Sequence, residues 1–194
     1  MSELIEVLTK DGSYSLRSLL FNENFHSLLG ALEETKLKFT ATSNLQRFKG
    51  KSLNVLDICF GIGYNSASLL NELIKQKSYL NLYALEIDKK PLEYSLRNES
   101  FLKLWSPKVK TIFASLYRKN YFKDQLFKCS VLWGDAREKI NIIPSSIKEA
   151  ELYPKPKHIS RTLRDLPLNL CKLEVAVNFD FVSSNAPNKL WKFS

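Results

Sequence analysis

The sequence predicts an α/β fold of the Rossmann-like type, in which strands and helices alternate around a parallel sheet. An apolar run ending in Asp57 leads into the turn Gly61-Ile-Gly63, as a buried strand does before a tight loop. Residues 66–75 have the pattern of a helix, and residues 79–88 that of a second strand with Glu86 near its end. This order of elements is typical of a unit that binds a nucleotide-like ligand.

Two elements are predicted ahead of this unit. Residues 4–17 alternate in the manner of a short hairpin around the turn dipeptide Asp11-Gly12. Residues 27–39 follow the period of an amphipathic helix, with Leu28 and Phe39 expected among its buried positions.

Four more elements are predicted after it. A helix over 91–104 opens with a proline, which suits the first helical turn. Residues 127–133 indicate a strand, 136–140 a short helix and 179–182 a further strand.

The residues around the turn favour S-adenosylmethionine over a dinucleotide. A dinucleotide site needs a third glycine where this chain has Ser66, and Asp57 would repel a pyrophosphate. The same Asp57 suits the ammonium of an amino acid moiety, and Glu86 is placed to accept both ribose hydroxyls. Two alternatives remain open, which are a nicotinamide-dependent oxidoreductase and a βαβ unit whose glycines only form a turn.

Length and composition predict one cytoplasmic domain. The 194 residues are 44% hydrophobic and 12% aromatic, enough for a single core. No segment approaches the ~18 apolar residues that span a bilayer, and the N-terminus does not have the pattern of a signal peptide. No membrane association is therefore expected.

Cysteine and histidine are too sparse and too scattered to predict a metal site. Cys59, Cys129 and Cys171 lack CxxC spacing, so they are expected to be core thiols. The chain has two histidines, His26 and His158. No metal is expected.

The net charge favours an anionic partner. Lys and Arg number 29 against 20 Asp and Glu, a formal net charge of +9. Basic and aromatic residues interleave over Tyr117-Arg-Lys-Asn-Tyr-Phe-Lys123, a pattern that can pair with phosphates and stack on bases. RNA is the natural candidate, and the alternative is a solvated surface over core aromatics.

Several segments together resemble a known enzyme family. They cover about residues 9–142 and are Asp11-Gly-Ser-Tyr-Ser-Leu16, Asn24-Phe-His-Ser-Leu-Leu-Gly-Ala-Leu-Glu-Glu34, Leu56-Asp-Ile-Cys-Phe-Gly-Ile-Gly-Tyr-Asn65, Glu86 and Trp133-Gly-Asp-Ala136. The chain looks like the methyltransferase domain of the MnmC-like (MnmD-type) tRNA enzymes, which convert 5-aminomethyl-2-thiouridine at the wobble position to its methylaminomethyl form. The resemblance implies a class I S-adenosylmethionine-dependent methyltransferase fold, S-adenosylmethionine as donor and tRNA as substrate.

The resemblance also implies roles for individual residues. The cofactor pocket would comprise Asp57, Gly61, Gly63, Tyr64, Asn65, Glu86 and Asp135, with Asp135 near the adenine amino group. The substrate side would include His26, Ser27 and Glu33. Accordingly, residues 1–50 are expected to form a substrate-side segment and 53–142 the cofactor-binding core of one domain spanning 1–194.

The last quarter departs from the family. Relatives carry an aspartate close to the methylated amine, and Asn185 stands at that position, so it is the expected catalytic residue. An amide can accept a hydrogen bond but cannot take a proton at neutral pH. Residues 149–178 match nothing in the family, residues 143–178 are expected to form an atypical loop, and the fold is expected to be incomplete at the C-terminus. A degenerate, non-catalytic cofactor-binding protein is therefore an alternative to an active tRNA methyltransferase. The sequence identifies no protein partner.

Overall fold

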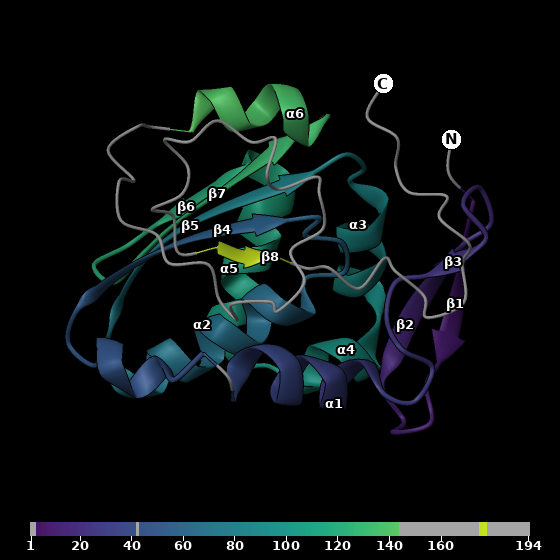
Figure 1. The fold of residues 1–194 in the computed structure, drawn as a ribbon, viewed down its shortest axis with the longest axis horizontal. Helices are drawn as coiled ribbons and strands as arrows, with labels where there is room; N and C mark the ends of the chain where they lie inside the picture. Colours follow the sequence, from purple (N-terminus) through teal and green to yellow (C-terminus); the bar gives the residue numbers. More distant parts are fainter. Residues whose placement is uncertain (1–2, 42, 144–174, 178–194) are drawn as a thin grey trace.

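The computed structural model describes residues 3–41, 43–143 and 175–177. A five-stranded sheet with the order β6-β7-β5-β4-β8 forms its centre (Figure 1). The four parallel strands are β4 (Ser52–Ile58), β5 (Tyr79–Glu86), β7 (Phe127–Trp133) and β8 (Val175–Val177). The short β6 (Tyr121–Lys123) pairs with β7 in the antiparallel sense.

Helices lie between β4 and β5 and between β5 and β7 in the chain, as parallel crossovers require. The described helices after β4 are α2 (Tyr64–Gln76), α3 (Lys90–Arg97), α4 (Glu99–Lys103), α5 (Pro107–Lys119), α6 (Ala136–Lys139) and the 3₁₀ turn η3 (Ile140–Ile142). The prediction of an α/β fold with a parallel sheet is confirmed.

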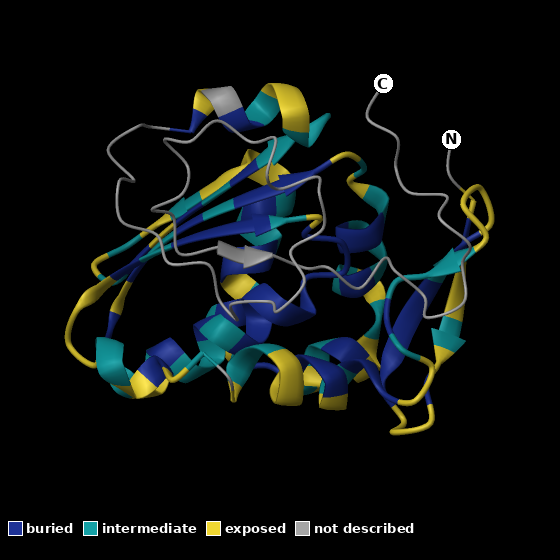
Figure 2. Ribbon diagram, viewed as in Figure 1, coloured by how far each residue is buried: buried dark blue, intermediate teal, exposed yellow. Residues whose placement is uncertain are grey.

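The core lies between one face of the sheet and the helices α2 and α5 (Figure 2). Alternate strand residues enter it, and the most buried are Leu53, Val55, Leu80, Leu82, Ala84, Phe127, Cys129 and Val131. On the other face, Asn81 Nδ2 donates to Asn54 Oδ1 at 2.8 Å, but Leu56 and Leu85 of the same face are buried as well. The strands of the βαβ unit therefore bury apolar side chains on both faces.

A small antiparallel sheet and two irregular helices precede the central sheet. The strands β1 (Leu4–Leu8), β2 (Tyr14–Ser18) and β3 (Glu23–Asn24) pair in chain order. They are followed by α1 (Ala31–Glu34), which continues as the π-helix η1 (Thr35–Thr40), and by the 3₁₀ helix η2 (Leu45–Phe48). The predicted hairpin around Asp11-Gly12 is thus confirmed.

Some predicted boundaries and burials were wrong. The helix expected from residue 27 begins at Ala31, and Leu28 is 47% exposed. The helix expected over 91–104 is interrupted because Asn98 is extended and its Oδ1 accepts from Phe101 N at 2.9 Å, which starts a new helix.

One further prediction is wrong, and one helix was not predicted. Cys59 was expected in the core, but it follows β4 and is exposed, whereas Cys129 is buried as expected. Part of the basic and aromatic segment 117–123 is the end of α5, a helix that the sequence reading missed. The strand predicted at 179–182 lies outside the described residues.

Candidate functional site

Three acidic residues lie at the carboxyl ends of adjacent parallel strands. Asp57 is the second-last residue of β4, Glu86 ends β5, and Asp135 follows β7 by two residues. Glu86 is in register with Trp133, and Gly134 N donates to the backbone oxygen of Glu86 at 2.9 Å. The carboxyl edge of an open α/β sheet is where such folds bind ligands.

Asp57 is a buried carboxylate with an unsatisfied oxygen. The residue is 1% exposed, and its Oδ2 accepts from Ser66 Oγ at 2.5 Å. The other oxygen, Oδ1, is buried and has no hydrogen-bond donor within the described part of the chain. Burial, the hydrogen bond from Ser66 and the nearby Glu86 together raise the pKa of Asp57 to about 7: burial raises it most, Ser66 lowers it and Glu86 raises it. A buried carboxylate oxygen of this kind fits a cationic ligand.

Glu86 lies across the glycine turn. Its Oε2 accepts from Gly61 N at 2.7 Å, while its Oε1 accepts from Ile87 N at 2.7 Å and Asp88 N at 3.2 Å. Burial raises the pKa of the Glu86 carboxyl in spite of these bonds. The carboxylate is therefore held in one orientation at the turn.

The two glycines of the turn have backbone conformations that other residues rarely adopt. Gly61 has a φ of 56° and Gly63 a φ of 93°. A Cβ at Gly63 would lie 2.5 Å from Phe113 Cε2, so helix α5 packs directly on the turn. Gly63 precedes α2, whose first N–H groups face the carboxyl edge of the sheet.

The other residues expected in the cofactor pocket have structural contacts of their own. Tyr64 is 1% exposed, and its hydroxyl donates to Tyr14 O at 2.9 Å. Asn65 Oδ1 accepts from Thr35 Oγ1 at 3.2 Å. Asp135 caps α6, where its pairing with Arg137 lowers the pKa of the carboxyl to about 2.

A small cavity of about 50 Å³ adjoins Asn65 but is lined mainly by apolar side chains. It lies between α2, β4 and the helices η1 and η2. None of the three carboxylates at the strand ends lines this cavity.

The segment 24–34 packs against the glycine turn and the start of α2. Phe25 Cδ1 would lie 3.3 Å from a Cβ at Gly61, and the His26 ring lies edge-on to Tyr64 with centroids 5.0 Å apart. His26 is 6% exposed, and burial lowers its pKa to about 4, so the imidazole is neutral at physiological pH. Ser15 Oγ lies 3.2 Å from its Nδ1.

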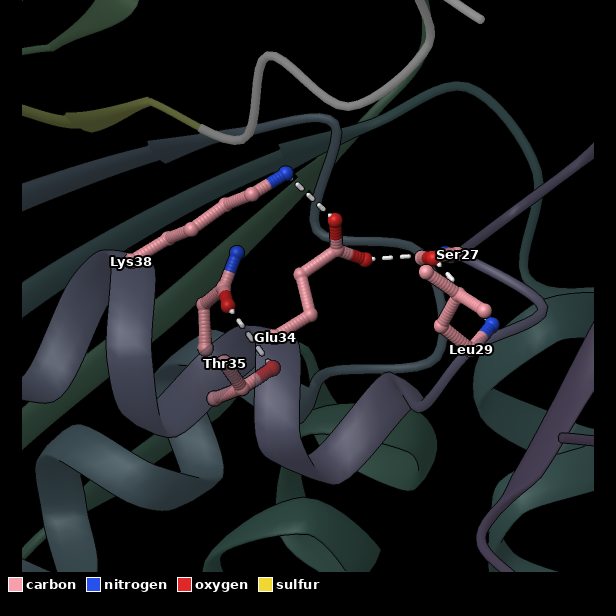
Figure 3. Close-up of polar contacts among 6 residues, drawn as sticks. Ser27, Leu29, Glu34, Thr35 and Lys38 are labelled. Carbon is pink, nitrogen blue, oxygen red and sulfur yellow. Dashed lines mark hydrogen bonds and ion pairs between the residues drawn. The ribbon is translucent and has the colours of Figure 1, made fainter. Parts of the chain in front are cut away.

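The acidic residue that lies beside Ser27 is Glu34 (Figure 3). Glu34 Oε2 accepts from Ser27 N at 2.9 Å, and Glu34 Oε1 pairs with Lys38 Nζ at 2.5 Å. Glu33, the residue chosen from sequence, is exposed, and its N donates to Asp11 Oδ2 at 3.0 Å. A helical wheel anchored at Ala31 could have distinguished the two, because Glu34 then falls on the buried side.

The hairpin loop caps helix α1 over a long distance in sequence. Ser13 Oγ accepts from Ala31 N at 3.0 Å and from Leu32 N at 3.1 Å, and Asp11 Oδ2 accepts from Glu33 N. A Cβ at Gly30 would lie 2.5 Å from Asp11 Oδ2, so this approach requires glycine. The hairpin loop at 11–13 and the helix start at 31–33 are therefore joined by capping hydrogen bonds.

Sequence reasoning also missed Ile87, an aliphatic side chain that is 62% exposed directly after Glu86. The predicted strand extended to residue 88, so no local signal indicated this exposure. Asn185 lies outside the described residues. Within the described ranges, no cluster of three metal-binding side chains occurs, and no helix is both long and apolar enough to cross a membrane.

Comparisons with known proteins agree with the fold. No protein-family model matches the chain. An uncharacterized protein of Methanocaldococcus jannaschii is 38% identical over 69 residues, which are 36% of this chain and 19% of that protein. The crystal structure of MnmC2 from Aquifex aeolicus matches with a TM-score of 0.58 and 26% identity, over 74% of this chain and 46% of that one. The chain thus spans about half the length of MnmC2 and shares its mixed α/β fold with a parallel sheet.

Proposed function

We propose that this chain is an S-adenosylmethionine-dependent methyltransferase that acts on the aminomethyl group of a wobble uridine in tRNA. The observation that carries the proposal is the unsatisfied, buried Oδ1 of Asp57 beside a glycine turn that Glu86 spans. Similarity to MnmC2 supports the same conclusion.

The residues at the carboxyl edge fit such a cofactor chemically. Asp57 would hold an ammonium, and Glu86 would accept ribose hydroxyls after giving up part of its hold on the turn. Asp135 would receive the adenine amino group, while exposed Ile87 offers apolar surface to the base. The positive end of the α2 helix adds a favourable field for a carboxylate.

The work of the protein in this reaction is positioning. When bound, the cofactor supplies an electrophilic methyl group on a sulfonium. The glycine turn, which Phe113 and Glu86 hold in place, would fix the cofactor. The segment 24–38 would form the wall that faces the tRNA amine. Holding both reactants in line contributes several orders of magnitude in rate. Asn185 would accept a hydrogen bond from the amine but take no proton.

A titration calorimetry experiment tests the cofactor. We expect S-adenosylhomocysteine to bind and NAD to give no heat. Glu86→Ala should weaken binding by ~1–3 kcal/mol, the value of hydrogen bonds to a charged group. Glu99→Ala is the matched control, because the Glu99 side chain is 85% exposed. Heat from NAD with none from S-adenosylhomocysteine would instead support the oxidoreductase.

A filter-binding salt series tests the RNA partner. The net charge of +9 is expected to give tRNA binding that weakens steeply with salt, because phosphate contacts release counterions. An affinity that does not change with salt would remove RNA as the partner.

The transfer of labelled methyl groups to hypomodified tRNA separates an active enzyme from a degenerate one. We expect little turnover from this chain, since Asn185 replaces the expected carboxylate. If that replacement is the defect, Asn185→Asp should raise transfer. Cofactor binding without transfer in either form would favour the non-catalytic alternative.

A further inference from the structure

Glu34 is a buried carboxylate beside Ser27 for which the proposed mechanism has no role. Glu34 is 9% exposed, and the next residue, Thr35, donates a hydrogen bond to Asn65 at the start of α2. The π-helix η1 begins directly after Glu34, and such helical irregularities are frequent at functional sites. The Glu34 side chain and Lys38 extend from the side of the helix that faces the parallel strands (Figure 3).

The two oxygens of Glu34 differ in how firmly they are held. Oε2 accepts a backbone N–H from Ser27, which fixes the carboxylate. Oε1 pairs with Lys38 Nζ at 2.5 Å, and the Lys38 side chain is 54% exposed. Burying a charged carboxylate costs several kcal/mol, so Glu34 needs a cation beside it. Because the Lys38 ammonium is half-exposed on a flexible side chain, another cation can take its place at Oε1.

The surroundings of Glu34 also suit an amine ligand. Burial raises the pKa of its carboxyl, but Lys38 and the Ser27 N–H outweigh that effect and lower it, so the group is ionised. The neutral imidazole of His26 is close enough for the two groups to shift each other's pKa. His26 Nε2 is buried and has no hydrogen-bond partner among the residues described.

We propose that Glu34 binds the amine of the substrate and that Lys38 competes with this amine for the carboxylate. This inference rests on the proposed function. The bound amine first loses a proton to water, because only the neutral amine has a lone pair for the attack. As that lone pair forms the N–C bond and the S–C bond breaks, sulfur keeps the electron pair of the broken bond and the nitrogen becomes positive. A fixed carboxylate stabilises that positive charge, and the nitrogen then releases its extra proton to water.

The test compares two RNAs that differ only in the amine. Fluorescence anisotropy is measured with an anticodon stem-loop carrying 5-aminomethyluridine and with one carrying 5-hydroxymethyluridine at the wobble position. We expect the unaltered chain to prefer the amine about tenfold, the low end for a charge-assisted hydrogen bond. Equal affinity for the two RNAs would overturn the inference.

Two substitutions should move the preference in opposite directions. Glu34→Gln should abolish it while leaving the affinity for the hydroxymethyl RNA within about twofold, because only the charge is removed. Lys38→Met should increase it by removing the competitor. Glu99→Gln, at an exposed position on α4, should change neither affinity. A preference that survives Glu34→Gln, or that falls in Lys38→Met, contradicts the proposal.

Two controls separate the possible failures. Thermal unfolding shows whether Glu34→Gln is folded. If it is not, the amine preference of Lys38→Met tests the proposal, because Lys38 is half-exposed and its substitution should leave the fold intact. Calorimetry with S-adenosylhomocysteine on the same preparations tests the proposed function. Absence of binding by the unaltered chain defeats that function, whereas normal binding without amine preference defeats only the role of Glu34. If Glu34→Gln and Lys38→Met both bind S-adenosylhomocysteine more weakly, the Glu34–Lys38 ion pair contacts the cofactor and not the substrate amine, which also overturns the inference.

Discussion

The two walls of the candidate site are built by different forces. The wall that we propose for the cofactor is the glycine turn, residues 61–63, which is packed on apolar side chains with Gly63 directly against Phe113. The wall that we propose for the substrate is the short helix α1, whose start is capped by Asp11 and Ser13 from a distant hairpin. These two surfaces are called the cofactor wall and the substrate wall below. Apolar packing fixes one geometry because interiors are close-packed. Polar caps fix the other wall, and because water can replace such hydrogen bonds we expect this wall to open more readily.

The largest effect is expected from Gly63→Ala. The new methyl would meet Phe113 at 2.5 Å in a backbone conformation with φ 93°. Overpacking and the left-handed conformation together should cost about 2–5 kcal/mol in the free energy of unfolding. Denaturant unfolding measures it. Gly50→Ala, at φ 70° with nothing within 4 Å, should show only the conformational part. Equal losses in both variants would mean that close packing does not define this wall.

The next effect concerns pH and the ligand. Burial raises the pKa of Asp57 from 3.8 to about 7. If the ionised form binds an ammonium, affinity for S-adenosylhomocysteine should rise roughly tenfold between about pH 6 and about pH 8. Asp57→Asn should flatten this dependence in calorimetry. A slope unchanged by the substitution would assign the titration to another group.

The same shift predicts the pH dependence of stability. Because the folded pKa of Asp57 is raised, its stabilising contribution is complete below about pH 4 and is lost as the pH rises through about 7. Unfolding of Asp57→Asn measured across this range should therefore vary less with pH than unfolding of the unaltered chain.

A moderate effect is expected at the substrate wall. Ser13→Ala leaves the N–H groups of Ala31 and Leu32 without their acceptor. The loss should be about 1 kcal/mol, as for a helix cap. Hydrogen exchange should show increased opening of α1 while β4 stays protected. Ser100→Ala, exposed on α4, is the control and should do neither. Uniform loss of protection across both regions would show that the two walls are one cooperative unit.

The smallest effect is a gain. Cys59 has a φ of 62°, a left-handed conformation that costs a side chain about 1 kcal/mol. Cys59→Gly should raise the free energy of unfolding by up to about 1 kcal/mol. Asn22→Gly, at φ 56°, should gain less because asparagine tolerates this region. A loss of stability in Cys59→Gly would mean that the thiol makes contacts worth more than the relieved strain.

Local pattern was enough to predict most of the central sheet. The strand at 127–133 and the helix and strand around the glycine turn were placed within about two residues, since alternation and helical period are local properties. The same reasoning missed α5, although Val109, Ile112, Phe113 and Leu116 have helical spacing. The basic and aromatic residues at its end were interpreted as a surface segment instead.

By itself, the sequence determined the order of elements, the glycine turn and the acidic residues at strand ends, because chain order and strand polarity bring those ends to one edge. Only the tertiary structure decided that Glu34, and not Glu33, is buried beside Ser27. It also decided that Ser13 caps a helix 18 residues away and that Tyr64 bonds the hairpin. These contacts join residues far apart in the chain, and their energy depends on distances that no local pattern records.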